Sequence, residues 1–232
     1  MKLLDALRGG LIVSVQAAPG SPLDDPAIIA AMALAAEMGG AVALRIQGSA
    51  NVRAVKSRCS LPVVGLIKRS YPGFEPYITP TRRDVEDTIE AGAEIVAFDA
   101  TARARPDGAS LEAIVACIHR AARIAMADCA SLDDGRRACA AGADILGTTL
   151  CGYTEATRAV TLPAIELAGA FGRLGCFAIC EGGIGDPASG RAALIGGADA
   201  IVVGTAISDL RARVGEFARA LQNAPIAGTL DL

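Results

Sequence analysis

The feature that most constrains the fold is an eightfold alternation of two kinds of segment. Short apolar runs rich in β-branched residues alternate with longer, alanine-rich stretches that have a helical pattern. We expect strands at 11–16, 41–46, 62–67, 94–99, 123–128, 144–148, 176–181 and 199–204. We expect helices at 26–38, 50–58, 82–91, 110–121, 132–141, 161–172, 187–196 and 207–221. Eight strand–helix units are what a closed parallel barrel needs, so the sequence predicts a single (β/α)8 (TIM) barrel.

A second regularity supports this count. The stretches MGGA, AGAE, AGAD and GGAD recur at intervals of roughly 50 residues, each between a helix and the next strand. They precede the second, fourth, sixth and eighth strands. Glycine readily adopts the left-handed conformation that ends a helix, after which the chain can turn directly into a strand. No linker rich in Gly, Ser or Pro interrupts the pattern, so we expect residues 1–232 to form one domain.

The composition suits a barrel and argues against several classes of protein. Hydrophobic residues make up 52% of the chain but aromatic residues only 3%, as expected for aliphatic parallel strands covered by small-residue helices. A net charge of -3 provides no basic surface for nucleic acid or an anionic membrane. No apolar run is long enough to span a bilayer, and no signal peptide is recognisable. We therefore expect a cytoplasmic protein.

The cysteines do not form a metal-binding pattern. The chain has seven of them, scattered and without a CxxC spacing, and only one histidine. A zinc site would need clustered ligands. Reduced thiols without a metal are therefore the expectation.

Polar side chains follow the predicted strands at the end where this fold carries its active site. Any one of them could be solvated or cap a helix, but five charged groups aimed at one barrel mouth are difficult to explain by chance. The proline-rich segment 68–81 is also too long for a plain strand–helix loop, and long loops at this end are usually functional. The strand-end residues are Gln16, Arg45, Lys68, Asp99, Asp128, Thr148, Glu181 and Gly204.

The ends of the seventh and eighth strands differ from the others because they are rich in glycine. EGGIGDP begins at Glu181, and GTAI begins at Gly204. Glycines let backbone N–H groups approach an anion, and many barrels hold phosphate at this position. The expected phosphate-binding residues are Gly182, Gly183, Gly204 and Thr205.

Lys68 and Glu181 are the pair best suited to proton chemistry. Inverting a carbon beside a carbonyl requires a base that removes its proton and an acid that returns one to the opposite face. A lysine after the third strand and a carboxylate on the seventh can approach a substrate from different sides. Lys68 can act as a base only if burial or a cation such as Arg45 favours its neutral form. The pair is therefore the prediction, and the assignment of base and acid stays open.

The chain resembles the N-acetylmannosamine-6-phosphate 2-epimerases over nearly its whole length, from Leu11 to about Ile207. The most specific matches are IKR followed by a tyrosine and ITPT, FDAT with RPDG, and GTTL with GYT. The resemblance implies conversion of N-acetylmannosamine 6-phosphate to N-acetylglucosamine 6-phosphate, a step of sialic acid catabolism. It also implies that no metal or organic cofactor is needed and that the chain forms a homodimer.

The matching motifs also imply roles for individual residues. Lys68 in GLIKR and Glu181 in CEGG would be the catalytic pair. Gly183, Gly204 and Thr205 would hold the phosphate through their backbone groups. The residues expected to bind the sugar and its N-acetyl group are Gln16, Arg45 and Asp128, with Thr148 as a further contact.

Two departures from the family pattern concern the phosphate. Gly183 stands where the family usually has a basic residue, and ISDL stands where the family usually has ITRP. The missing arginine would normally face the phosphate. Arg211 or Arg213, about one helical turn later, could replace it.

Two other interpretations remain open. The first is another phosphate-binding barrel enzyme, such as a thiazole- or thiamine-phosphate synthase or a lysine-imine aldolase. In an imine mechanism Lys68 would be the electrophile and Glu181 its proton shuttle. The second is a non-enzymatic barrel that binds sugar phosphates, which would keep the glycine turns but would not need Lys68 and Glu181 together.

Overall fold

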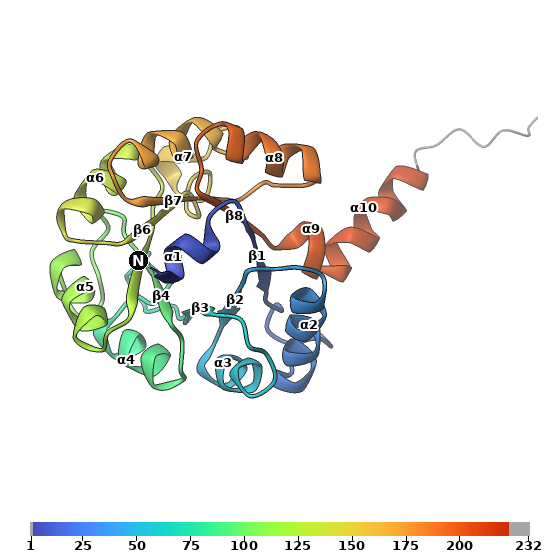
Figure 1. The fold of residues 1–232 in the computed structure, drawn as a ribbon, viewed down its shortest axis with the longest axis horizontal. Helices are drawn as coiled ribbons and strands as arrows, with labels where there is room; N and C mark the ends of the chain where they lie inside the picture. Colours follow the sequence, from blue (N-terminus) through green and yellow to red (C-terminus); the bar gives the residue numbers. More distant parts are fainter. Residues whose placement is uncertain (1, 223–232) are drawn as a thin grey trace, which may run out of the picture.

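The computed structural model describes residues 2–222, which form one closed barrel of eight parallel strands (Figure 1). Each strand pairs with the next, and β8 pairs with β1 through Leu11 and Ile201. All eight predicted strands are present within two residues of their expected bounds, which confirms the fold. The strands are β1 (Leu11–Val15), β2 (Ala43–Gln47), β3 (Val63–Leu66), β4 (Ile95–Asp99), β5 (Ile124–Asp128), β6 (Ile145–Gly147), β7 (Phe177–Glu181) and β8 (Ala200–Val203).

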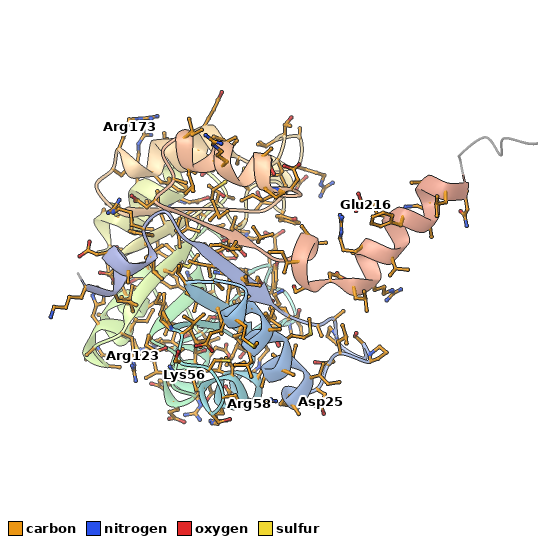
Figure 2. The ribbon with its side chains drawn as sticks, turned by 45° about the vertical axis from the view of Figure 1, so that its right-hand side comes forward. Asp25, Lys56, Arg58, Arg123, Arg173 and Glu216 are labelled. Carbon is orange, nitrogen blue, oxygen red and sulfur yellow. The ribbon has the colours of Figure 1, made fainter. Side chains whose placement is uncertain are left out.

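Helices surround the barrel in the order that the sequence predicts (Figure 1). Charged side chains such as Arg58 and Arg173 lie on the outside of this ring (Figure 2). No helix among residues 2–222 is long and apolar enough to cross a membrane. The helices are α1 (Lys2–Leu7), α2 (Pro26–Met38), α3 (Ser49–Lys56), α4 (Arg82–Glu90), α5 (Leu111–Arg120), α6 (Leu132–Ala140), η1 (Glu155–Thr157), α7 (Ile165–Gly172), α8 (Pro187–Ile195), α9 (Thr205–Ser208) and α10 (Leu210–Gln222).

Two helical predictions need correction. The helix expected at 161–172 begins only at Ile165, after the Leu162–Pro163 turn. The helix expected at 207–221 is divided into α9 and α10 at Asp209, whose side chain accepts a hydrogen bond from the Ala212 N–H at 2.9 Å. Asp209 therefore caps a new helix instead of continuing the old one.

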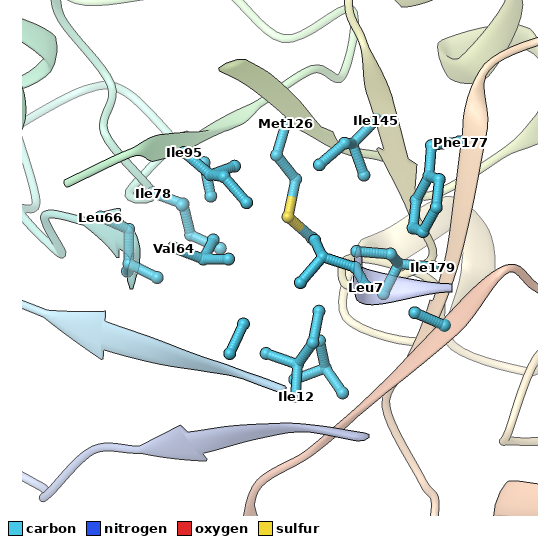
Figure 3. Close-up of a cluster of buried hydrophobic side chains, with 14 of the residues drawn as sticks. Leu7, Ile12, Val64, Leu66, Ile78, Ile95, Met126, Ile145, Phe177 and Ile179 are labelled. Atoms are coloured by element: carbon cyan, nitrogen blue, oxygen red, sulfur yellow. The ribbon is translucent and has the colours of Figure 1, made fainter. Parts of the chain in front are cut away.

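Aliphatic side chains fill the barrel interior and leave it solid (Figure 3). Ile12, Val64, Met126 and Ile179 come from four different strands and are all buried. The short helix α1, which the sequence pattern did not indicate, adds the fully buried Leu7 to this cluster. Because the interior is packed, ligand binding is confined to the ends of the strands and their loops.

The repeated glycine turns adopt the predicted conformation. Gly40, Gly92, Gly142 and Gly197 have φ of 96°, 102°, 91° and 104°, in the left-handed region. These turns introduce β2, β4, β6 and β8, as expected. The repeat therefore reflects four copies of one helix-to-strand connection.

The acidic residues of three of these turns have a structural function. The carboxylates of Glu94, Asp144 and Asp199 accept hydrogen bonds from the N–H groups of Val63, Ala125 and Ala178, at 2.9, 2.8 and 2.8 Å. Each acid thus binds the backbone at the start of the preceding strand. This contact ties neighbouring strands together at the end of the barrel opposite the predicted site.

Helix α10 stands apart from the barrel. It leaves between α8 and α2 and extends away from them (Figure 1). None of its residues is buried. The shorter α9, by contrast, packs against β1.

Candidate active site

A pocket of about 1060 Å³ opens at the carboxyl ends of the strands. It lies where this fold places its active sites. Eight of the ten residues that the sequence predicts for catalysis, substrate and phosphate line this one pocket. They are Gln16, Arg45, Lys68, Glu181, Gly182, Gly183, Gly204 and Thr205.

The long segment after β3 forms a turn that holds Lys68 in place. Lys68 pairs with Ile78 in an antiparallel bridge, and the Arg69 N–H donates to the Tyr77 carbonyl at 2.9 Å. Thr79 closes the turn, because its hydroxyl accepts from the Ile67 N–H at 3.1 Å. The returning chain also brings Tyr77 to the pocket wall, a residue that strand ends alone do not predict because it lies eleven positions beyond Leu66, the last residue of β3.

A buried guanidinium on the neighbouring strand organises a second part of the pocket. Arg45 on β2 is 1% exposed, and its Nη2 donates to Asp128 Oδ2 at 2.6 Å. Its Nε lies 3.2 Å from Glu181 Oε1. The single cation therefore holds carboxylates from β5 and β7 together, which would otherwise repel each other.

Thr149 completes this network on its other side. Its hydroxyl oxygen lies 2.8 Å from Asp128 Oδ1 and 2.8 Å from Glu181 Oε2. Thr149 lines the pocket but was not among the predicted residues. The GTTL motif could have indicated it, since Thr149 directly follows the Thr148 that was chosen.

The structure places Thr148 differently from the expectation. Its side chain is fully buried and does not line the pocket. The hydroxyl instead donates to the Glu181 carbonyl at 2.8 Å and accepts from the Glu181 N–H at 3.0 Å. Thr148 therefore holds the backbone of Glu181 and has no free group for a substrate.

Asp128 is also placed differently from the expectation. It is 0% exposed and lies beneath the pocket surface, in contact with Arg45 and Thr149. The structure does not bring its carboxylate to the pocket wall. Its effect on a ligand is therefore transmitted through Arg45 and Thr149.

The pKa values of the proposed pair are shifted towards each other. Lys68 is solvent-exposed at the open end of the pocket, yet protein atoms surround it closely enough that lost hydration lowers its pKa. Arg45 lowers this pKa further, and the carboxylates of Glu181 and Asp128 oppose the change. Burial raises the pKa of Glu181, against the opposing effect of Arg45. Both shifts favour the uncharged forms, a neutral amine and a protonated carboxyl.

Two further groups in the network have shifted pKa values. Burial raises the pKa of Asp128, although Arg45 opposes this. Burial alone would lower the pKa of Arg45, but Asp128 and Glu181 raise it overall. Arg45 therefore stays charged throughout the physiological pH range.

The glycine turns after β7 and β8 form the other side of the pocket. Gly182 and Gly183 have φ of 100° and 74°, a region that favours glycine. A Cβ added to Gly183 would lie 2.4 Å from the Leu162 Cβ. A basic side chain would not fit here without a change of backbone, which accounts locally for the departure from the family pattern.

Two arginines of α10 contribute to the wall of the pocket. Of the arginines in the described part of this helix, Arg213 and Arg219 line the pocket, whereas Arg211 does not. Arg213 forms an ion pair with Glu216 at 2.5 Å. Of the two candidates for replacing the missing arginine, only Arg213 is therefore at the pocket.

An eight-stranded barrel with a lysine, a carboxyl group and glycine turns around one mouth defines a (β/α)8-barrel enzyme equipped for proton transfer. The comparisons with known proteins identify the family. The profile of the family described as putative N-acetylmannosamine-6-phosphate epimerase matches residues 29–223, and the chain belongs to this family.

Individual relatives align with this chain over nearly their whole length. A putative N-acetylmannosamine-6-phosphate 2-epimerase from Klebsiella pneumoniae subsp. pneumoniae is 49% identical over 217 residues, 94% of this chain and 92% of that one. A protein with the same description from Salmonella typhimurium is 47% identical, covering 94% of each chain. The N-acetylmannosamine-6-phosphate 2-epimerase from Clostridium perfringens superposes with a TM-score of 0.91 at 38% identity, covering 94% of this chain and 96% of that one.

A thiamine phosphate pyrophosphorylase from Pyrococcus furiosus has a TM-score of 0.57 at 16% identity and covers 95% of this chain and 98% of its own. Likeness at this level extends to the fold alone.

Proposed function

We propose that this protein interconverts N-acetylmannosamine 6-phosphate and N-acetylglucosamine 6-phosphate by moving the proton at C2, as a step in sialic acid catabolism. One observation carries the proposal. Lys68 follows β3 and Glu181 ends β7, on opposite sides of the barrel; both line the same pocket, and their pKa values are shifted towards a neutral base and a protonated acid. Membership of the epimerase family supports the identity of the substrate.

The chemistry follows from the position of the carbonyl group. In the open-chain sugar, C2 lies beside the C1 aldehyde, so its proton is the acidic one. Neutral Lys68 takes this proton, and the electron pair moves onto the aldehyde oxygen to form an enolate. Protonated Glu181 then donates its proton to C2 from the opposite face. In the reverse direction the two groups exchange roles.

Two polar atoms without an aligned hydrogen-bond partner suit the substrate, and one of them, Arg45 Nε, also lies 3.2 Å from Glu181 Oε1 in an ion pair. Within the described residues, Gln16 Oε1 and Arg45 Nε are buried and have no aligned hydrogen-bond partner. Gln16 Oε1 is an acceptor for the acetamide N–H of the sugar. Arg45 Nε is a donor for the oxygen that becomes negative in the enolate. Direct sugar contacts are assigned to these two residues. Asp128 holds Arg45 from beneath, and Thr148 holds the backbone of Glu181.

The phosphate binds at the glycine-rich side of the pocket. Gly182, Gly183, Gly204 and Thr205 line this side, and their conformations leave room for backbone N–H groups to face an anion. The guanidinium of Arg213 adds the positive charge that the family pattern usually supplies from elsewhere. Its ion pair with Glu216 is surface-exposed, so it can be exchanged for a phosphate contact at small energetic cost.

The functional unit is a homodimer. In helix α10 an apolar row recurs at spacings of four, three and four residues, so it occupies one face. The neighbouring helices α8 and α2 each expose an isoleucine, Ile195 and Ile28. A second copy of the chain would cover α10 and these surfaces in a symmetric exchange. The row consists of Leu210, Val214, Phe217 and Leu221, which are 62%, 58%, 63% and 72% exposed.

The reaction takes place in the cytoplasm. All seven cysteines are free thiols in the structure, as expected in a reducing compartment.

The test is NMR of N-acetylmannosamine 6-phosphate in D₂O. The native protein is expected to produce the gluco epimer with deuterium at C2. Lys68→Met is expected to lower the rate by at least about 100-fold, the range of a lost general base. The matched control is Lys56→Met, because Lys56 pairs with Glu94 far from the pocket. Native protein without C2 exchange, or undiminished activity in Lys68→Met, would contradict the proposal.

The same preparation separates an epimerase from an imine-forming enzyme. The chain contains only three lysines, Lys2, Lys56 and Lys68, so a covalent adduct is easily located by mass spectrometry. Borohydride added with substrate should trap no adduct on Lys68. A reduced adduct there would replace the epimerase mechanism with an imine mechanism.

A further inference from the structure

Thr149 occupies an unusual position between two acidic groups. Its Oγ1 lies 2.8 Å from an oxygen of Asp128 and 2.8 Å from an oxygen of Glu181. The hydroxyl lines the pocket, whereas Asp128 is buried behind it. Thr149 is therefore the direct link between the proposed acid and a carboxyl group that does not reach the pocket.

The residues around Thr149 are arranged to permit this contact. A Cβ added to Gly147 would lie 3.0 Å from Thr149 Oγ1 and 2.8 Å from Met126 Cε. Thr148 fixes the backbone of Glu181 from the neighbouring position. The three residues of the GTT sequence thus leave space, anchor β7 and bridge the two carboxyl groups.

A count of protons constrains the state of this link. A threonine hydroxyl has one proton to donate and lone pairs that accept. With both carboxyl groups ionised, it can donate to only one, and its lone pairs would face the other at 2.8 Å. Both contacts are hydrogen bonds only when one carboxyl is protonated and donates to the hydroxyl.

Arg45 closes the network on the other side. It donates to Asp128 Oδ2 and lies against Glu181 Oε1, so the inner oxygens, Asp128 Oδ1 and Glu181 Oε2, face Thr149. The four residues form a ring in which the shared proton has only these inner oxygens as its sites. We propose that Thr149 is a positioning residue for the epimerisation, whose hydroxyl lets Asp128 and Glu181 share one proton and presents it on Glu181 when Lys68 is neutral. This inference rests on the proposed function of the Lys68–Glu181 pair.

The surrounding charges agree with a single shared proton. Arg45 and Lys68 are the cations that act on the pair, while Asp99 and Tyr77 interact electrostatically with Asp128. Asp99 is neutralised locally by Arg103, whose Nη2 lies 2.7 Å from its Oδ2. With Lys68 neutral, the Arg45 charge balances one carboxylate but not two. A second buried negative charge would be unfavourable, and one retained proton removes it.

The bridge has a measurable consequence. It stabilises the singly protonated pair relative to both the fully ionised and the doubly protonated forms. The two apparent pKa values of the pair are therefore moved apart, and the acid-competent state persists over a wider range of pH. Removing the hydroxyl should bring the two values closer together.

The test compares Thr149→Val, which removes the hydroxyl at nearly constant volume, with Thr149→Ser, which retains it. Thr149→Val is expected to lower kcat by about 10- to 100-fold with KM within about 3-fold of native. It should also move the alkaline limb of the kcat profile down by about one pH unit, as for one lost hydrogen bond to a charged group. Thr149→Ser should keep kcat within about 3-fold of native and leave the alkaline limb at its native pH.

Two controls separate this effect from folding. Thr88→Val removes a hydroxyl that bonds to the Asp84 carbonyl on α4, outside the pocket, and should leave the kcat profile unchanged. Thermal melting of each variant identifies misfolded protein. The inference is overturned if folded Thr149→Val keeps its alkaline limb and kcat, or if Thr149→Ser is as impaired as Thr149→Val.

A substrate-free titration keeps the inference separate from the proposed function. The side-chain carboxyl resonances of Asp128 and Glu181, followed by ¹³C NMR, report the two apparent pKa values directly. Their separation should shrink by at least about one unit in Thr149→Val, because the upper value falls by about one unit and the lower value rises. If native protein fails to epimerise the sugar, the proposed function fails, and this separation alone decides the inference. An unchanged separation overturns it.

Discussion

Arg45 shows how one residue links stability to the site. Its guanidinium is almost fully buried and holds two carboxyl groups from different strands. An intact buried network of this kind need not add net stability. Removing one of its members, however, strongly lowers the free energy of unfolding because a buried charge loses its partner. We therefore expect the residue that assembles the site to contribute to the stability of the fold as well.

Arg45→Met should lower the free energy of unfolding by about 3–5 kcal/mol, since Asp128 and Glu181 would be left without their cation. Urea unfolding followed by circular dichroism measures this change. The exposed Arg173→Met is the matched control and should stay within about 0.5 kcal/mol of native. A loss below about 1 kcal/mol in Arg45→Met would contradict the importance of the network.

The pKa shifts predict a bell-shaped dependence of kcat/KM on pH. Lys68 must be neutral to act as base, so activity should fall as pH decreases through its lowered pKa. Glu181 must be protonated to act as acid, so activity should fall as pH rises through its raised pKa. Initial rates between about pH 5 and 10 test this. A rate that only increases up to the highest pH would exclude Glu181 as the acid.

Among single residues, the sequence predicts those that end strands better than those that act through neighbours. Lys68, Glu181, Arg45 and Gln16 all reach the pocket because strand ends in a parallel barrel converge. The direction of a side chain at a strand end depends on the pleat, so neighbouring residues point to different sides. For this reason Thr149 lines the pocket, whereas Thr148, the residue predicted from the sequence, does not.

The turns between helices and strands are determined by the local sequence where their backbone conformation requires glycine. The adjacent residues Gly39 and Gly40 form a matched pair within one turn. Gly40 has φ of 96° with open space around its Cβ position, while Gly39 has φ of -78°. Any penalty for a side chain at Gly40 is therefore purely conformational.

Gly40→Ala should destabilise the protein by about 1–2 kcal/mol because alanine resists positive φ. The melting temperature should fall by about 2–8 °C for a chain of this length. Gly39→Ala, whose backbone alanine adopts freely, should change the melting temperature much less. Equal effects of the two substitutions would show that something other than the left-handed conformation matters in this turn.

Helices were less predictable where capping or tertiary contacts override the local apolar pattern. The expected eighth helix is divided because Asp209 caps a second helix, although the apolar pattern continues through 207–221. Helix α1 is short and has no clear periodicity, yet it places Leu7 in the barrel core. Its helical form therefore depends on a binding surface made by distant strands.

At the scale of the whole molecule, α10 is a helix with no buried residue, so its apolar side chains lack a covering surface. Its apolar row is exposed in the isolated chain, and such a row usually marks an interface. A homodimer in which each α10 packs on the other copy would remove this exposure.

Analytical ultracentrifugation should find native protein as a dimer and Phe217→Asp shifted towards monomer, because a buried charge in an apolar interface is unfavourable. Arg211→Asp, on the flank of the same helix, should remain dimeric. A monomeric native protein at micromolar concentration would contradict the dimer, and a fully dimeric Phe217→Asp would exclude this face as its interface.

The order of strands and helices, the closed barrel, the glycine turns and the family could all be read from the sequence. These features depend on local propensity, periodicity and motifs, which the order of residues contains directly. Tertiary structure alone decided that Asp128 lies behind Arg45, that Thr149 bridges the acids, and that α10 leaves the barrel. Such contacts join residues far apart in the chain, and their geometry depends on the twist and packing of every intervening strand.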